Sequence, residues 1–293
     1  MLRNIFTSPN EDRLRSGWRL LLHFLLLGFI IVLALPLFLG LSESSPVLAF
    51  LADDFLISAI PITLSIYIAR RFWDKRSFAS LGIKLNDAAT RDLLFGIFMP
   101  ALLMALVFLV QWALGWLQFE GFAWQLDRLD LAAIGYWAFG FILVGWYEEL
   151  LTRGYWLQNL ADGLGTPLAL FISSAVFSLL HLANPSASVA SVIGILAAGY
   201  FLAYPYLRTG SLWLSIGLHI GWNFFQGPIF GFPVSGLKST ALLIHTESGP
   251  DLFTGGPFGP EAGLIVFPTL ALGAYLVYLF TQNRKPIPAE EIA

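Results

Sequence analysis

The sequence predicts an all-α integral membrane protein of about eight transmembrane helices. Of its 293 residues, 57% are hydrophobic and only 12% are charged, whereas a soluble domain carries about 25% charged residues. The apolar residues gather in long runs, and the basic residues lie between alternate runs. Runs of this length are typical of helices that have lipid as their solvent.

Eight stretches have the length that a membrane-spanning helix needs, about 20 apolar residues for a hydrocarbon core roughly 30 Å thick. The first stretch is about twice as long as the apolar part of a signal peptide and lacks a small-residue cleavage site, so we expect it to be retained. The predicted spans are residues 18–39, 47–69, 93–116, 131–160, 167–183, 188–207, 211–230 and 261–281.

Basic residues predict the orientation of these spans. With a cytoplasmic N-terminus, only Arg128 and Lys238 fall outside, while Arg153 lies within a span. This positive-inside asymmetry over an even number of spans predicts that both termini are cytoplasmic. No loop is long enough for a separate domain, so residues 1–293 are expected to form one membrane domain. The predicted cytoplasmic basic residues are Arg3, Arg13, Arg15, Arg19, Arg70, Arg71, Lys75, Arg76, Lys84, Arg91, Arg208, Arg284 and Lys285.

Ionisable side chains within a span cost about 2.5–3.5 kcal/mol each, so each requires a partner or a function. His23 is alone near the cytoplasmic end of its span, where we expect a packed neutral imidazole. Asp53 and Asp54 are expected at the outer boundary of the second span rather than in a site. The absence of cysteine excludes disulfides, thiolate metal sites and cysteine nucleophiles.

The fourth span carries Glu148, Glu149 and Arg153 in apolar surroundings. Glu149 and Arg153 are four residues apart, so they share a helix face and are predicted to form an ion pair. Glu148 projects about 100° away and has no such partner on its own helix. A charge cluster at a helix end is the alternative interpretation of this motif taken alone.

The fifth span contains Phe177 and His181. If the chain turns near residues 163–165, both Glu148 and His181 lie roughly 24–26 Å from that turn, at matching depth on antiparallel helices. Phe177, one turn before His181, is expected to pack against the imidazole. This depth is in the outer half of the bilayer under the predicted topology, and the face from which a substrate enters stays open.

The seventh span places His219 and Asn223 on one helix face, four residues apart. Interhelical hydrogen bonding is the alternative interpretation for such a pair. The sixth span presents Ala190, Gly194 and Ala198 at four-residue steps, a small-residue face that predicts close helix packing.

Together these spans offer a carboxylate, two imidazoles and an amide. A carboxylate in an apolar site is an effective general base for water, which fits Glu148, and His181 could orient the water and return a proton to a leaving amine. His219 and Asn223 could donate hydrogen bonds to a developing oxyanion. Two His and one Glu are also a catalytic zinc set, so one divalent metal such as zinc stays open, although no H-E-x-x-H helix is present.

Three ordered motifs, E-E-x-x-x-R, F-x-x-x-H and H-x-x-x-N, each lie in a separate span. Through them the chain resembles the CPBP intramembrane proteases, also called type II CAAX prenyl endopeptidase and lysostaphin-resistance-like proteins. The resemblance implies an eight-span helical fold with a catalytic core in spans four to seven, residues 131–230. The expected catalytic residues are Glu148, Glu149, His181, His219 and Asn223, with Arg153 and Phe177 as structural support.

The resemblance implies an endopeptidase that acts on a peptide substrate, either a prenylated tail, as in eukaryotic members, or a bacteriocin-type peptide. The bilayer is the other expected partner, and no nucleic-acid partner or organic cofactor is predicted. Two rival functions stay open. One is a non-catalytic immunity or scaffold protein of the same family, and the other is a proton-coupled carrier, which would favour internal repeats that the sequence lacks.

Overall fold

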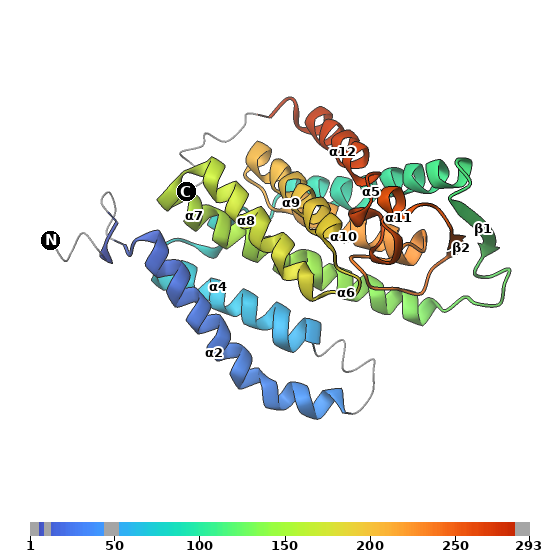
Figure 1. Cartoon of the computed structure of the whole chain (residues 1–293). Helices are drawn as coiled ribbons and strands as arrows, with labels where there is room; N and C mark the ends of the chain where they lie inside the picture. Colours follow the sequence, from blue (N-terminus) through green and yellow to red (C-terminus); the bar gives the residue numbers. More distant parts are fainter. Residues whose placement is uncertain (1–5, 9–12, 44–52, 285–293) are drawn as a thin grey trace.

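The structure is a computed structural model that describes residues 6–8, 13–43 and 53–284. Its helices form a bundle from which α2 and α4 splay away at one side (Figure 1). The helices are α2 (Ser16–Ser42), α4 (Ile60–Phe72), α5 (Asp87–Ala113), α6 (Leu131–Glu149), α7 (Leu157–Leu164), α8 (Thr166–Leu180), α9 (Val189–Thr209), α10 (Trp213–Phe224), α11 (Asp251–Thr254) and α12 (Val266–Thr281). Short π-helical and 3-10 segments continue or join them: η1 (Asp53–Ala59), η2 (Phe78–Leu81), η3 (Leu150–Trp156), η4 (His181–Ala183), η5 (Phe225–Ile229), η6 (Gly256–Phe258) and η7 (Pro260–Ala262).

Local sequence signals set the ends of the long helices. The Asn86 side chain accepts a hydrogen bond from the Ala89 N–H at 2.8 Å and so caps α5. Ser188 and Ser191 form a capping box at the start of α9, and Gly210 ends this helix in the left-handed conformation, with φ of 67°.

Six helices in the described part are long and apolar enough to cross a membrane, as judged by length and composition. They agree with the first six predicted spans, although the fourth continues to Leu164 instead of ending at 160. The predicted spans 211–230 and 261–281 correspond to α10 with η5 and to the 16-residue helix α12. Both are shorter than a typical span, so the count of eight stays a prediction. The six helices cover Ser16–Leu41, Phe55–Phe72, Asp87–Ala113, Leu131–Leu164, Thr166–Ala183 and Val189–Thr209.

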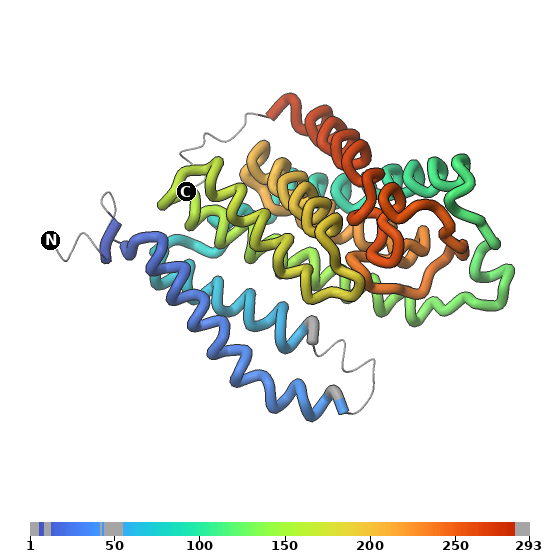
Figure 2. The backbone as a smooth tube through the Cα atoms, viewed as in Figure 1, coloured from blue at the N-terminus to red at the C-terminus, as the bar shows by residue number. Residues whose placement is uncertain are grey.

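Helix α10 is the centre of the bundle and packs against α5, α6 and α9. Its residues 214–223 are all buried. Glycines permit this close approach: a Cβ on Gly217 would lie 2.4 Å from the Leu93 carbonyl oxygen, and one on Gly221 would lie 2.1 Å from that of Ile97. The N-terminal helices and α12 lie on opposite sides of the bundle (Figure 2).

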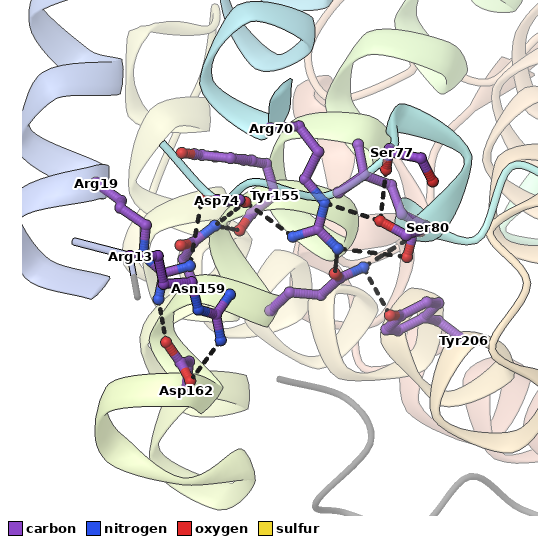
Figure 3. Close-up of polar contacts among 12 residues, drawn as sticks. Arg13, Arg19, Arg70, Asp74, Ser77, Ser80, Tyr155, Asn159, Asp162 and Tyr206 are labelled. Atoms are coloured by element: carbon purple, nitrogen blue, oxygen red, sulfur yellow. Dashed lines mark hydrogen bonds and ion pairs between the residues drawn. The ribbon is translucent and has the colours of Figure 1, made fainter. Parts of the chain in front are cut away.

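A buried cluster of charges ties α2 and α4 to α7 (Figure 3). Asp74 accepts hydrogen bonds from Arg19 Nη1 at 3.2 Å and from Arg70 Nη1 at 2.8 Å. Asp162 on α7 accepts from Arg13 Nη2 at 3.1 Å and also from Arg19. Because Arg19, Arg70 and Asp74 are almost inaccessible to solvent, this cluster fixes how the first two helices meet the bundle.

His23 is a packed residue, as the sequence predicts. Its side chain is buried, its Nε2 lies 3.2 Å from Ser65 Oγ, and its ring lies against Tyr155 with centroids 4.6 Å apart. The side chains of Asp53 and Asp54 lie outside the described residues, as does the 47–52 part of the second predicted span.

The two ends of the bundle differ in charge, and we call them the basic end and the far end. The basic end holds the cluster of Figure 3, the start of α5 and the end of α12, where Arg284 forms a bidentate ion pair with Asp92 at 2.5 and 2.8 Å. The far end holds the end of α5, the start of α6 and residues 181–188. The long helices α5, α6, α8 and α9 thus run in alternation between the two ends (Figure 1), and the eight-span topology stays a prediction. Arg3 and Lys285 lie outside the described residues.

The described chain is mostly helical, as predicted, but two loops at the far end also pair as strands. Strand β1 (Leu117–Phe122) and strand β2 (Leu243–Glu247) form an antiparallel sheet with an irregularity between Phe119 and Gly121. The two segments are more than 100 residues apart in the chain. Their pairing satisfies backbone N–H and C=O groups that would otherwise lie unpaired beside the helix ends.

Candidate active site

Four of the predicted residues line one cavity of about 410 Å³. Glu148 comes from the end of α6, His181 from the turn after α8, and His219 and Asn223 from α10. The rest of the wall is largely apolar and consists of Trp137, Phe141, Val144, Tyr147, Leu180, Asn184, Val234, Ser235 and Leu237. Three helices that are distant in sequence therefore bring these polar groups together.

Glu149 is fully buried, and the predicted ion pair with Arg153 forms, with Arg153 Nη1 donating to Glu149 Oε1 at 2.7 Å. Arg153 also donates to Thr152 Oγ1 at 2.8 Å and to the Gly199 carbonyl oxygen at 3.2 Å. The pair lies where α6 passes into the π-helical segment η3. Such widened turns are frequent at functional sites.

His219 lies between both glutamates. Its Nδ1 is 2.9 Å from Glu149 Oε1, and its Nε2 is 3.7 Å from Glu148 Oε2. Because an ionised carboxylate can only accept a hydrogen bond, Nδ1 carries a proton. Glu149 therefore orients the imidazole as well as pairing with Arg153, a role that the sequence did not predict.

Glu148 differs from its neighbour in exposure and partners. Its side chain is 23% exposed, whereas that of Glu149 is 0% exposed. Glu148 Oε2 has no hydrogen-bond partner among the described residues. Oε2 itself is buried beside His219, so the exposed part of the Glu148 side chain, which lines the cavity, is the part placed to meet water or a substrate.

The backbone fixes the tautomer of His181. Its Nδ1 lies 2.8 Å from the Phe177 carbonyl oxygen, which can only accept, so Nδ1 carries the proton and Nε2 of the neutral ring is an acceptor. The predicted packing of Phe177 forms, with ring centroids 4.7 Å apart. Phe177 also lies 6.1 Å from the His219 ring and 4.1 Å from Arg153 Cζ. Asn223 is one turn beyond His219 and is buried to 7% exposure.

Sequence reasoning missed Glu261. A second, small cavity of about 30 Å³ is bordered by His181, His219, Asn223 and Glu261, which is room for about one water molecule. Glu261 Oε2 accepts from Gln226 Nε2 at 2.6 Å. In the sequence, Glu261 is only an acidic residue at the edge of the predicted span 261–281. In the structure, helix α12 begins at Val266, and Glu261 lies in the preceding turn η7.

Burial raises the pKa of Glu261 to about 7, although its own backbone N–H, the side chains of Gln226 and Trp222 and the backbone of Ser235 oppose the shift by hydrogen bonding. Because this pKa lies above its ordinary value of 4.5, the folded state binds more protons than the unfolded state between these values. Stability from this group is therefore fully present below the lower value and falls as the pH rises towards the higher one.

We expect the melting temperature of the wild type to fall more between about pH 5 and about pH 7.5 than that of the Glu261→Gln variant, which has no proton to lose there. Thermal unfolding in detergent measures the two slopes. Glu43→Gln, which alters an exposed carboxylate after α2, is the control and should keep the wild-type slope. Equal slopes in the wild type and Glu261→Gln would contradict this account of Glu261.

The fold and the site define an integral membrane protein with a carboxylate–imidazole cluster in a cavity between its helices. Residues 130–225, which contain all three motifs, match the model of the family "Type II CAAX prenyl endopeptidase Rce1-like". The resemblance predicted from the motifs is thus confirmed for this segment. A Bacillus subtilis (strain 168) protein, "Uncharacterized protein YyaK", is 30% identical over 183 residues, which are 60% of this chain and 59% of that protein. No solved structure matches the chain.

Proposed function

We propose that the protein is an intramembrane endopeptidase that hydrolyses a peptide bond with a water molecule activated by Glu148 and His181. The observation that carries the proposal is that Glu148, His181, His219 and Asn223 line one cavity. The Glu148 carboxylate, on a side chain that is 23% exposed and lines the cavity, and the acceptor nitrogen of His181 are the two groups suited to binding and deprotonating water.

In the proposed reaction, Glu148 accepts a proton from water while the water oxygen forms a bond to the peptide carbonyl carbon. His181 Nε2 orients this water through its lone pair. The tetrahedral intermediate then breaks its C–N bond, and the proton taken from water passes through His181 to the leaving amine. The products are a carboxylic acid, which keeps the water oxygen and its second proton, and an amine; Glu148 is ionised again, and no covalent bond to the protein forms.

His219 and Asn223 supply the donors for the negative charge that develops on the carbonyl oxygen. With Nδ1–H bound to Glu149, an imidazolium form of His219 presents Nε2–H as the second donor. The Asn223 carboxamide lies one turn away on the same helix. Preorganised donors of this kind contribute several kcal/mol in a site that excludes water.

A metal-assisted reaction is the second mechanism that the residue types predict. In the described part of the chain, no three His, Asp or Glu side chains are arranged as metal ligands. The Nδ1 atoms of His219 and His181 bind Glu149 and the Phe177 carbonyl oxygen, which leaves both Nε2 atoms free, as in metal-ligating histidines. Because the described residues as placed do not bring three ligands together, no step is assigned to a metal ion.

The family name indicates a prenylated peptide as one candidate substrate, and an unmodified apolar peptide is the other. The apolar wall of the cavity suits either. We further propose that both termini are cytoplasmic, because the basic end gathers the Lys and Arg residues of the described part, apart from Arg128, Lys238 and the buried Arg153.

The test is incubation of the purified protein in detergent with prenylated and unmodified peptides, followed by mass spectrometry of the fragments. We expect the wild type to cleave and His181→Ala to lose about 10²-fold or more in rate, because general acid–base catalysis contributes about 10²–10⁴-fold. Ser178→Ala, one turn away and bound to the Val192 carbonyl, is the control and should retain activity.

Undiminished cleavage by His181→Ala would contradict the role of this imidazole. A folded wild type that cleaves no peptide would favour the scaffold function instead. A chelator added to the same assay decides the mechanism: activity should persist, and a loss of activity that zinc restores would show that a metal is required.

A further inference from the structure

Along α6, the cavity of the candidate site lies on one side of Glu148 only. On α6 its lining residues are Glu148 and residues that precede it, as far as Trp137. Its other walls come from Leu180, His181 and Asn184, from His219 and Asn223 on α10, and from Val234, Ser235 and Leu237. No residue of α6 or η3 beyond Glu148 lines it.

The opposite direction is closed by packing. Residues 149–159, which follow Glu148 towards the basic end, are all buried. Leu150 and Tyr155 pack with Ile66, Tyr206 and Leu212 in one apolar cluster. No lining residue of the cavity comes from this stretch. A peptide approaching from the basic end would therefore have to part α4, α9 and α10.

Contacts between helices place the site along the bundle. Gln158 Nε2 donates to the Tyr206 hydroxyl at 2.8 Å, close to the charge cluster of the basic end. Glu148 precedes Gln158 by ten residues, which is about 15 Å of helix. Beyond the site, Asn184 Nδ2 donates to the Ser235 carbonyl oxygen at 3.0 Å. This contact joins two far-end segments across the wall of the cavity.

The far end carries the charge pattern of an extracytoplasmic surface. Among the described residues, its basic side chains are Arg128 and Lys238. Its exposed acidic side chains include Glu120, Asp127 and Asp130. Because cytoplasmic segments are enriched in Lys and Arg, the basic end is the cytoplasmic one.

We infer that the candidate site opens towards the extracytoplasmic side, so that its substrate is a peptide segment presented from the outer face of the membrane. That a substrate enters this cavity rests on the proposed function. The direction in which the cavity opens rests only on packing and charge. A cytosolic C-terminal tail is therefore expected to be a poor substrate, because the buried residues 149–159 separate the cytoplasmic side from the cavity.

The natural chain has no cysteine, so single cysteines report accessibility without background. Leu237, 40% exposed at the rim of the cavity, and Leu85, 83% exposed at the basic end, are matched positions. In intact bacterial cells expressing each variant, a membrane-impermeant thiol reagent should label Leu237→Cys. It should label Leu85→Cys only after permeabilisation. The reverse pattern would overturn the inference.

A second experiment uses sealed proteoliposomes in which thiol labelling gives the fraction of molecules in each orientation. Peptide added outside should be cleaved in proportion to the molecules whose residue 237 faces outwards. Cleavage confined to molecules whose residue 85 faces outwards would overturn the inference and leave the proposed function intact. If nothing is cleaved in either orientation, the proposed function fails while the labelling still decides the direction of the opening.

Discussion

Glu148→Gln is expected to lower the rate of peptide hydrolysis by about 10²–10⁴-fold, the contribution typical of a general base. Glutamine keeps the shape of the side chain but cannot accept a proton from water. Because Glu148 Oε2 has no hydrogen-bond partner in the described structure, the substitution leaves no protein donor unpaired at that atom. Fold and stability should therefore change little.

Single-turnover rates of the purified variant against one cleaved peptide measure this effect, with melting temperatures to verify folding. Glu43→Gln is the matched control, since it removes a carboxylate that is exposed and remote from the cavity. A Glu148→Gln variant that is folded and cleaves at the wild-type rate would show that another group activates the water.

Arg153→Met is expected to destabilise the protein by about 3–5 kcal/mol, the cost of removing one partner from a buried ion pair. Glu149 would lose its 2.7 Å hydrogen bond while it stays fully buried. The Gly199 carbonyl and the Phe177 ring would lose the guanidinium as well. Since Glu149 orients His219, activity should fall even in the fraction that remains folded.

Denaturant unfolding in mixed micelles measures this loss. Arg208→Met is the control, because Arg208 is only partly buried and bonds to Thr281, and its loss should cost much less. Combining Arg153→Met with Glu149→Gln should recover part of the stability by removing the unpaired charge. Equal stabilities for the Arg153→Met variant and the wild type would contradict the proposed role of the pair.

Contacts within one helix were predictable from the sequence. A spacing of four residues gives the Glu149–Arg153 pair and the packing of Phe177 on His181, because both follow from helix geometry. Counting residues from the α7–α8 turn also places Glu148 and His181 at one depth, and both line the cavity. The six long helices were also predictable, because the length and apolar composition of each one are features of a single stretch of sequence.

Contacts between helices were not predictable in this way. The His219–Glu149 contact joins residues 70 positions apart and depends on how α10 is rotated against α6. Close glycine contacts set that rotation: a Cβ on Gly145 would lie 2.6 Å from Ile220 Cγ1. No periodicity in the sequence encodes it. The π-helical segment after Glu149 and the position of Glu261 are likewise set by packing.

The most direct measurement is cleavage of a peptide library by the purified wild type and by Glu148→Gln, read by mass spectrometry for new termini. The proposed function predicts defined fragments from the wild type and a loss of about 10²-fold or more in the variant. No fragments from the folded wild type, or the same fragments at the same rate from both proteins, would contradict it.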